Sequence, residues 1–111
     1  MSDTREERVA AAKARMAELA EKFLDRTAVE IDTMRARLAR VGDDAGALAE
    51  IRNLAHRACG TGATLGFESL SDCAHRIEVL TAAQPPVSRA EILSAIDALA
   101  QELARQPRAA C

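Results

Sequence analysis

The chain has 111 residues, of which 49% are hydrophobic and only two are aromatic, and its formal net charge is −2. This length suits one domain and is too short for two. The interspersed charges and the shortage of aromatic side chains argue against nucleic-acid binding, which uses basic surfaces and base stacking. We therefore expect a single domain whose core consists of aliphatic side chains packed between helices.

Three features of the sequence bear on its location. No apolar run approaches the roughly 18 residues of a membrane-spanning helix. The N-terminus, MSDTREER, is charged and lacks the apolar segment of a secretion signal. Three unpatterned cysteines suit a reducing compartment better than a disulfide framework. We expect a cytoplasmic protein that does not enter a membrane.

The first part of the chain has the pattern of a helix. Ser2 or Asp3 can cap its N-terminus. Apolar residues then recur at helical spacing from Val9 to Leu24. Thr27 and Glu30 form a capping box, and they can open a second helix or lie inside one long helix.

Two further helices are expected after this stretch. The turn Gly42-Asp43-Asp44 ends the preceding pattern and supplies a cap for the next helix, which we expect over residues 44–64. Gly66 ends that helix. The next helix is expected over residues 68–83, and the pair Pro85-Pro86 stops it because proline lacks a backbone donor and restricts the residue before it.

The last helix has clear signals at both ends. Ser88 and Glu91 form a capping box that opens it. Pro107 ends it, and residues 107–111 are expected to form a frayed tail.

Short links between helices favour antiparallel neighbours. We therefore predict an all-α fold, an antiparallel up-down-up-down four-helix bundle with an extra N-terminal helical segment. In this prediction residues 1–111 form one domain, with the N-terminal segment over residues 1–26 and the bundle over residues 27–106.

His56 has an unusual position in the expected 44–64 helix. On a helical wheel it lies roughly 140° from the centre of the apolar face, so we expect its ring to point to water. Its neighbours one and two turns away are Ala49, Arg52, Gly60 and Ala63. A glycine inside a helix costs about 1 kcal/mol relative to alanine, so Gly60 indicates close approach by another molecule.

The segment AHRACGTGATLGFESLSDCAHRIE, residues 55–78, resembles the signature of histidine-containing phosphotransfer (Hpt) domains. The matching positions are Ala55-His56, Gly60, Leu65-Gly66-Phe67, Leu70, Cys73 and Ile77-Glu78. This resemblance implies that His56 accepts a phosphoryl group from a receiver-domain aspartate, or from a histidine kinase or hybrid kinase, and passes it to another response-regulator receiver domain. In the family a short first helix precedes the bundle, which favours a bend between Asp25 and Thr27.

The residues around His56 fit a carrier better than an enzyme. A neutral imidazole has a lone pair on one ring nitrogen and is a usable nucleophile. Phosphoryl transfer needs an in-line approach and neutralisation of charge. The sequence has no glycine-rich phosphate loop and no carboxylate cluster beside His56 that would hold Mg²⁺. We therefore expect no cofactor on this chain, with Mg²⁺ bound by the partner receiver domain.

Cys59 departs from the family pattern, which has a lysine at this position. A thiol offers the phosphoryl oxygens neither a charge nor a strong donor. Arg52, one turn before His56 on the same side, is the candidate that could stabilise the phosphate instead, and Arg57, about 100° round the helix, is a weaker one. The departure leaves open an alternative function: a module of this fold that binds a receiver domain or signalling partner without carrying phosphate.

Ala49, Gly60, Ala63 and Val79 are the residues expected to form a docking surface for the partner. Val79 points away from the apolar stripe of the 68–83 helix and could join the rim around His56. His75 lies on the polar face of the same helix and is expected to be an ordinary surface histidine. No exposed heptad seam is present, so we expect a monomer.

A zinc site is the remaining alternative, since His56, Cys59, Cys73 and His75 include the residue types of tetrahedral sites. Cys73 lies in an apolar stripe and should face the core, whereas His75 should face outward. One ion could not easily bind both, so we expect no metal site of this composition.

Overall fold

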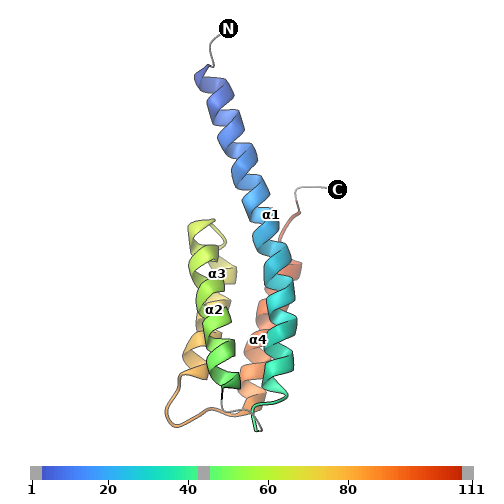
Figure 1. The fold of residues 1–111 in the computed structure, drawn as a ribbon, viewed down its shortest axis with the longest axis vertical. Helices are drawn as coiled ribbons and strands as arrows, with labels where there is room; N and C mark the ends of the chain where they lie inside the picture. Colours follow the sequence, from blue (N-terminus) through green and yellow to red (C-terminus); the bar gives the residue numbers. More distant parts are fainter. Residues whose placement is uncertain (1–3, 43–45, 109–111) are drawn as a thin grey trace.

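The computed structural model describes residues 4–42 and 46–108 (Figure 1). Its four helices are α1 (Arg5–Leu38), α2 (Ala47–Thr64), α3 (Glu68–Thr81) and α4 (Arg89–Ala104). No strand is present in these residues. The predicted all-α fold is confirmed.

The helices form an up-down-up-down bundle in which each helix runs opposite to the one before it (Figure 1). α1 packs against α2, α2 against α3, α3 against α4, and α4 closes the ring against α1. No helix that the structure describes within residues 4–108 is long and apolar enough to span a membrane.

α1 is one continuous helix across Asp25 to Thr27, so Thr27 and Glu30 lie inside one long helix and do not open a second one. The hydroxyl of Thr27 is buried and donates a hydrogen bond of 2.8 Å to the carbonyl oxygen of Phe23, one turn earlier. This hydroxyl therefore bonds within a helix that continues past it and does not cap a new one. Phe23, Leu24 and Ile31 are buried on one face of this helix, before and after Thr27. The packing of α1 against the bundle is therefore continuous across Thr27.

The N-terminal half of α1 projects beyond the other helices (Figure 1). Its 34 residues make it about 50 Å long at about 1.5 Å per residue, roughly twice the length of its neighbours. Val9, Met16 and Leu19 are exposed, and Phe23 is the first buried residue of the helix. The apolar pattern that precedes Phe23 therefore lies outside the core.

The helix ends agree with the sequence in part. Thr4 caps α1, with its side chain accepting a hydrogen bond of 3.0 Å from the backbone N–H of Glu7, whereas Ser2 and Asp3, the expected caps, lie outside the described residues. Ser88 caps α4 as predicted, accepting a 3.2 Å bond from the N–H of Glu91.

The two middle helices are shorter than expected. α2 begins at Ala47 with Gly46 as its N-cap and no side-chain cap bond; the expected cap, Asp44, lies outside the described residues. Gly66 follows α2 with a φ of 88°, the left-handed conformation that ends helices. α3 ends at Thr81, two residues before the expected end.

The segment after α4 is held against α1. Arg108 forms an ion pair with Glu21 at 3.2 Å and another with Asp25. At this residue the chain differs from the predicted frayed tail; residues 109–111 lie outside the described part.

The core lies between the four helices and is almost entirely aliphatic. Its buried residues are Phe23, Leu24, Ile31, Met34, Leu38, Ile51, Ala55, Leu70, Ile77, Ile92, Ala95, Ile96 and Leu99. The two aromatic rings, Phe23 and Phe67, stack with their centroids 5.4 Å apart. A Cβ atom added to Gly62 would lie 3.3 Å from the Phe23 ring, whereas one added to Gly60 would meet nothing within 4 Å.

These two glycines give a matched test of the packing. We expect Gly60→Ala to stabilise the protein by about 1 kcal/mol, because alanine is the better helix former and the space is open. We expect Gly62→Ala to lose this gain, because displacing the buried Phe23 ring costs about 1–3 kcal/mol. Urea unfolding of both variants measures the difference, and equal stabilisation by the two changes would contradict the packing described.

Candidate functional site

His56 lies in the middle of α2 on the face opposite the core. The buried residues of this helix, such as Ile51, Ala55 and Ala58, point into the bundle. The His56 side chain is 72% exposed. The expectation that its ring points to water is confirmed.

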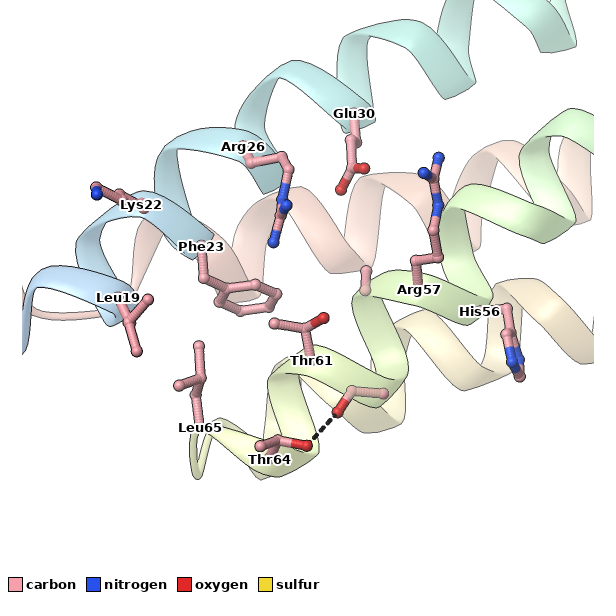
Figure 2. Close-up of a pocket in the computed structure, with 12 residues that line it drawn as sticks. Leu19, Lys22, Phe23, Arg26, Glu30, His56, Arg57, Thr61, Thr64 and Leu65 are labelled. Atoms are coloured by element: carbon pink, nitrogen blue, oxygen red, sulfur yellow. Dashed lines mark hydrogen bonds between the residues drawn. The ribbon is translucent and has the colours of Figure 1, made fainter. Parts of the chain in front are cut away.

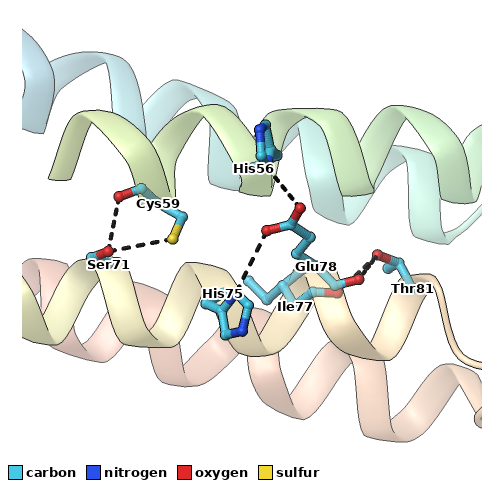
Figure 3. A network of polar contacts seen from close by, with 7 residues as sticks. All are labelled: His56, Cys59, Ser71, His75, Ile77, Glu78 and Thr81. Atoms are coloured by element: carbon cyan, nitrogen blue, oxygen red, sulfur yellow. Dashed lines mark hydrogen bonds and ion pairs between the residues drawn. The ribbon is translucent and has the colours of Figure 1, made fainter. Parts of the chain in front are cut away.

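Glu78 of α3 contacts the ring of His56 (Figure 3). Its Oε2 lies 2.6 Å from Nδ1 of His56. An ionised carboxylate can only accept a hydrogen bond, so Nδ1–H donates and the lone pair is left on Nε2. Glu78 thus fixes the tautomer and the orientation of a ring that is otherwise in solvent.

The same carboxylate also faces the second histidine. Oε1 of Glu78 lies 3.6 Å from Nδ1 of His75, one turn earlier on α3. His75 is exposed, as predicted. In the sequence Glu78 stands out only as a motif position. Its contact with His56 could not be predicted there, because that contact depends on how α2 and α3 pack.

Cys59 lies at the contact between α2 and α3 and is partly buried. The Ser71 hydroxyl donates a 2.8 Å hydrogen bond to the carbonyl oxygen of Cys59. The Cys59 thiol is 3.4 Å from the same Ser71 oxygen (Figure 3). The position at which the family has lysine is therefore used here for a contact between helices.

The predicted docking residues differ in exposure. Gly60, Ala63 and Val79 are exposed, and the space beside Gly60 is open. Ala49 and Arg52 are partly buried. The exposed face around His56 is thus wider on the side of Gly60 than on the side of Ala49.

A groove of about 950 Å³ runs between α1 and α2 and includes His56 in its lining (Figure 2). Its basic residues are Lys22, Arg26 and Arg57, and its acidic residue is Glu30. Arg57, the weaker candidate in the sequence, thus lines this groove, and Arg52 does not. The contributions of Lys22 and Arg26 were missed because they lie some thirty residues earlier, in α1.

The position of Glu30 in this groove changes the pKa of its carboxyl group. Burial raises the pKa of its carboxyl group, and the charges of Arg26 and Arg57 oppose that rise. With its pKa raised on folding, Glu30 adds stability only at acidic pH, and this contribution is lost as the pH rises through its pKa in the folded protein. Arg26 and Arg57 are thus the neighbours in this groove that favour the charged form of Glu30.

The expected zinc alternative, with His56, Cys59, Cys73 and His75, does not form as one group. Cys73 packs against the core. Burial, followed by the charges of Glu102 and Asp72, raises the pKa of its thiol, which disfavours the thiolate that a metal needs. Within the described residues, the ligand atoms that lie within 4.8 Å of one another belong instead to Cys59, His75 and Glu78.

The comparison with protein families agrees with this geometry. The family model described as the Hpt domain matches residues 18–106. The chain belongs to the Hpt domain family. The match includes all of α2, α3 and α4 and the bundle half of α1, and it leaves out most of the projecting half. No curated protein and no solved structure matches the chain.

The family gives the chain its general role. An Hpt domain is a histidine phosphotransfer module of two-component signalling. It is a phosphocarrier and not an enzyme in the usual sense. It interacts with receiver domains and histidine kinases in phosphorelays.

The bond between Glu78 and His56 predicts a specific ring state. We expect the neutral His56 ring to carry its proton mainly on Nδ1, and Glu78→Gln to shift the ring toward a mixture of tautomers, because an amide can accept or donate. Two-bond ¹⁵N–¹H correlation spectra of the ring measure this. His75→Gln is the control and should leave the His56 tautomer unchanged; an unaltered tautomer in Glu78→Gln would refute the assignment.

Proposed function

We propose that His56 is the phosphoacceptor of this Hpt domain, receiving a phosphoryl group from a receiver-domain aspartate or a kinase module and passing it to another receiver domain. The observation that carries the proposal is the state of the ring. His56 is exposed in the middle of α2, with its Nδ1 2.6 Å from Oε2 of Glu78. Nε2 is thereby left as the nucleophile.

The transfer forms one bond to phosphorus and breaks another. The Nε2 lone pair attacks phosphorus, the N–P bond forms, and the P–O bond to the aspartyl carboxylate breaks, with the electron pair leaving on that carboxylate. The ring keeps its Nδ1 proton throughout, and the Glu78 carboxylate stabilises the positive charge that develops on the ring. Mg²⁺ on the receiver domain would neutralise the phosphoryl oxygens, as phosphoryl transfer requires.

Two arginines are candidates to stabilise the phosphate or to attract the partner. Arg52 is partly buried one turn before His56. Arg57 lines the basic groove together with Lys22 and Arg26. This groove would raise the local concentration of an acidic partner surface and speed its association. We therefore assign a steering role to the groove and keep Arg52 as the candidate contact with the phosphoryl oxygens.

The docking surface proposed for the receiver domain consists of Gly60, Ala63 and Val79 around His56, with Ala49 at its edge. Small residues let another protein approach the helix backbone closely. The space beside Gly60 is open, so packing inside the bundle does not require a glycine at this position. This observation supports a role for Gly60 in docking.

Replacement of the acceptor is the direct test. We expect His56→Gln to abolish transfer of ³²P from a phosphorylated receiver domain, because glutamine lacks the nucleophilic ring nitrogen, while the fold is retained because the side chain is exposed. The label on the wild-type chain should be acid-labile and base-stable, as phosphohistidine is. His75→Gln is the matched control and should be labelled normally. Undiminished labelling of His56→Gln would refute the proposal.

The alternative of a partner-binding module without phosphate gains support from one observation, the thiol of Cys59 that faces Ser71 where the family has a lysine. The same experiment separates the two functions. A wild-type chain that binds a receiver domain yet takes no label from any receiver of its cell would favour the alternative.

Docking is tested at Gly60. We expect Gly60→Glu to weaken binding to the receiver domain about tenfold or more, since each 1.4 kcal/mol of lost interaction is a factor of ten and a buried unpaired charge costs at least that. Titration calorimetry measures the affinity, and circular dichroism checks the fold. Gly60→Ala is the control and should bind nearly as tightly as wild type; an unchanged affinity for Gly60→Glu would place the interface elsewhere.

A further inference from the structure

Three metal-binding residue types meet where α2 packs against α3. Cys59 belongs to α2, while His75 and Glu78 lie one turn apart on α3. One ligand atom from each of the three lies within 4.8 Å of the other two. His75 and Glu78 are already directed toward each other, with Nδ1 and Oε1 3.6 Å apart (Figure 3).

The donor set suits zinc. A thiolate sulfur, an imidazole nitrogen and a carboxylate oxygen are the ligands of protein zinc sites, with bond lengths of about 2.0–2.3 Å in a tetrahedral arrangement. Donors at such distances from one ion are themselves about 3–4 Å apart, so shifts of about 1 Å by these three side chains would complete the set. One thiolate and one carboxylate also balance the charge of Zn²⁺.

The surroundings favour entry of an ion and a defined position for the thiol. The side chain of His75 is 63% exposed and that of Glu78 is 25% exposed, so solvent reaches the group. The hydroxyl of Ser71 lies 3.4 Å from the sulfur of Cys59, which gives the sulfur a polar neighbour outside the set of three ligands. Such neighbours orient ligands and tune the metal.

We propose that Cys59, His75 and Glu78 form a Zn²⁺ site with one open coordination position, and that the ion shares Glu78 with His56. On binding, the Cys59 thiol gives its proton to solvent and the sulfur coordinates as thiolate. Oε1 of Glu78 coordinates the ion, while Oε2 faces His56. The site differs from the set His56, Cys59, Cys73 and His75 in using Glu78 and excluding the core-facing Cys73.

Metal binding would change the phosphoacceptor through the shared carboxylate. A carboxylate that coordinates Zn²⁺ is a weaker hydrogen-bond acceptor, so the Nδ1–H of His56 is held less firmly and Nε2 becomes a poorer nucleophile. Zinc would therefore slow phosphotransfer. This consequence rests on the proposed function of His56, whereas the metal site itself does not.

Cobalt spectroscopy tests the site independently of phosphotransfer. The full-length chain, reduced and metal-free, is titrated with Co²⁺ and then with Zn²⁺ in competition. We expect one equivalent to bind, with a thiolate-to-cobalt charge-transfer band in the near ultraviolet and intense tetrahedral bands in the visible. Zn²⁺ should displace the cobalt and abolish these bands.

The variants assign the ligands. Loss of a partner outside the ligand set typically costs about 10- to 100-fold in affinity, so loss of a ligand should cost about 100-fold or more. We expect this loss in Cys59→Ser, His75→Gln and Glu78→Gln. Cys73→Ser and Cys111→Ser are the thiol controls and should keep the bands. A wild-type chain without the charge-transfer band, or a Cys59→Ser chain that retains it, would overturn the site.

The effect on His56 is tested by the rate of phosphotransfer from a phosphorylated receiver domain, with and without saturating Zn²⁺. Each variant is compared with its own metal-free rate. We expect zinc to slow the wild-type chain about tenfold, the effect of losing roughly 1.4 kcal/mol of transition-state stabilisation, and to leave the rate of Cys59→Ser nearly unchanged. Equal slowing of both would show that zinc acts on the receiver and would overturn the link. A metal-free chain that takes no phosphate would count against the proposed function and not against the spectroscopic result.

Discussion

The close packing of α2 against α3 is the constraint on which the site depends. The inner face of α2 presents small residues, and the backbone of α3 comes near enough that a Cβ atom on Gly62 would lie 3.5 Å from the backbone nitrogen of Ser71. This proximity lets short side chains bridge the helices. Ser71 reaches the carbonyl group of Cys59 at 2.8 Å, and two turns further along Glu78 reaches His56 at 2.6 Å. A larger residue at Gly62 would separate the helices and loosen both contacts.

Glu78 is the residue through which the packing of α2 against α3 affects the ring of His56. An exposed imidazole on an isolated helix would rotate freely and exchange between tautomers. Here a carboxylate from the neighbouring helix accepts a hydrogen bond from Nδ1 and leaves the lone pair on Nε2. Because its second oxygen faces His75, the same group connects His56 to a cluster that includes Cys59. The departure from the family's lysine and the proposed zinc site thus concern one small region of the surface.

α1 contributes in two different ways along its length. Its second half supplies Phe23, Leu24 and Ile31 to the core and forms one wall of the basic groove through Lys22 and Arg26. Its first half projects beyond the bundle (Figure 1), and the Hpt family match covers little of it. The part of α1 that belongs to the family is therefore the part that packs, and its cations line the same groove as His56.

The sequence by itself determined the helical class, the cap at Ser88 and the outward direction of His56, because capping and the spacing of apolar residues are local properties of the chain. It also gave the resemblance to Hpt domains. It did not determine the continuity of α1, since Thr27 can either cap a helix or bond to the preceding turn, and burial beside Phe23 decided in favour of the second. The neighbours of His56, Cys59 and Arg57 were likewise decided by tertiary structure. Glu78, Ser71 and Glu30 come from other helices and approach them only when the bundle packs.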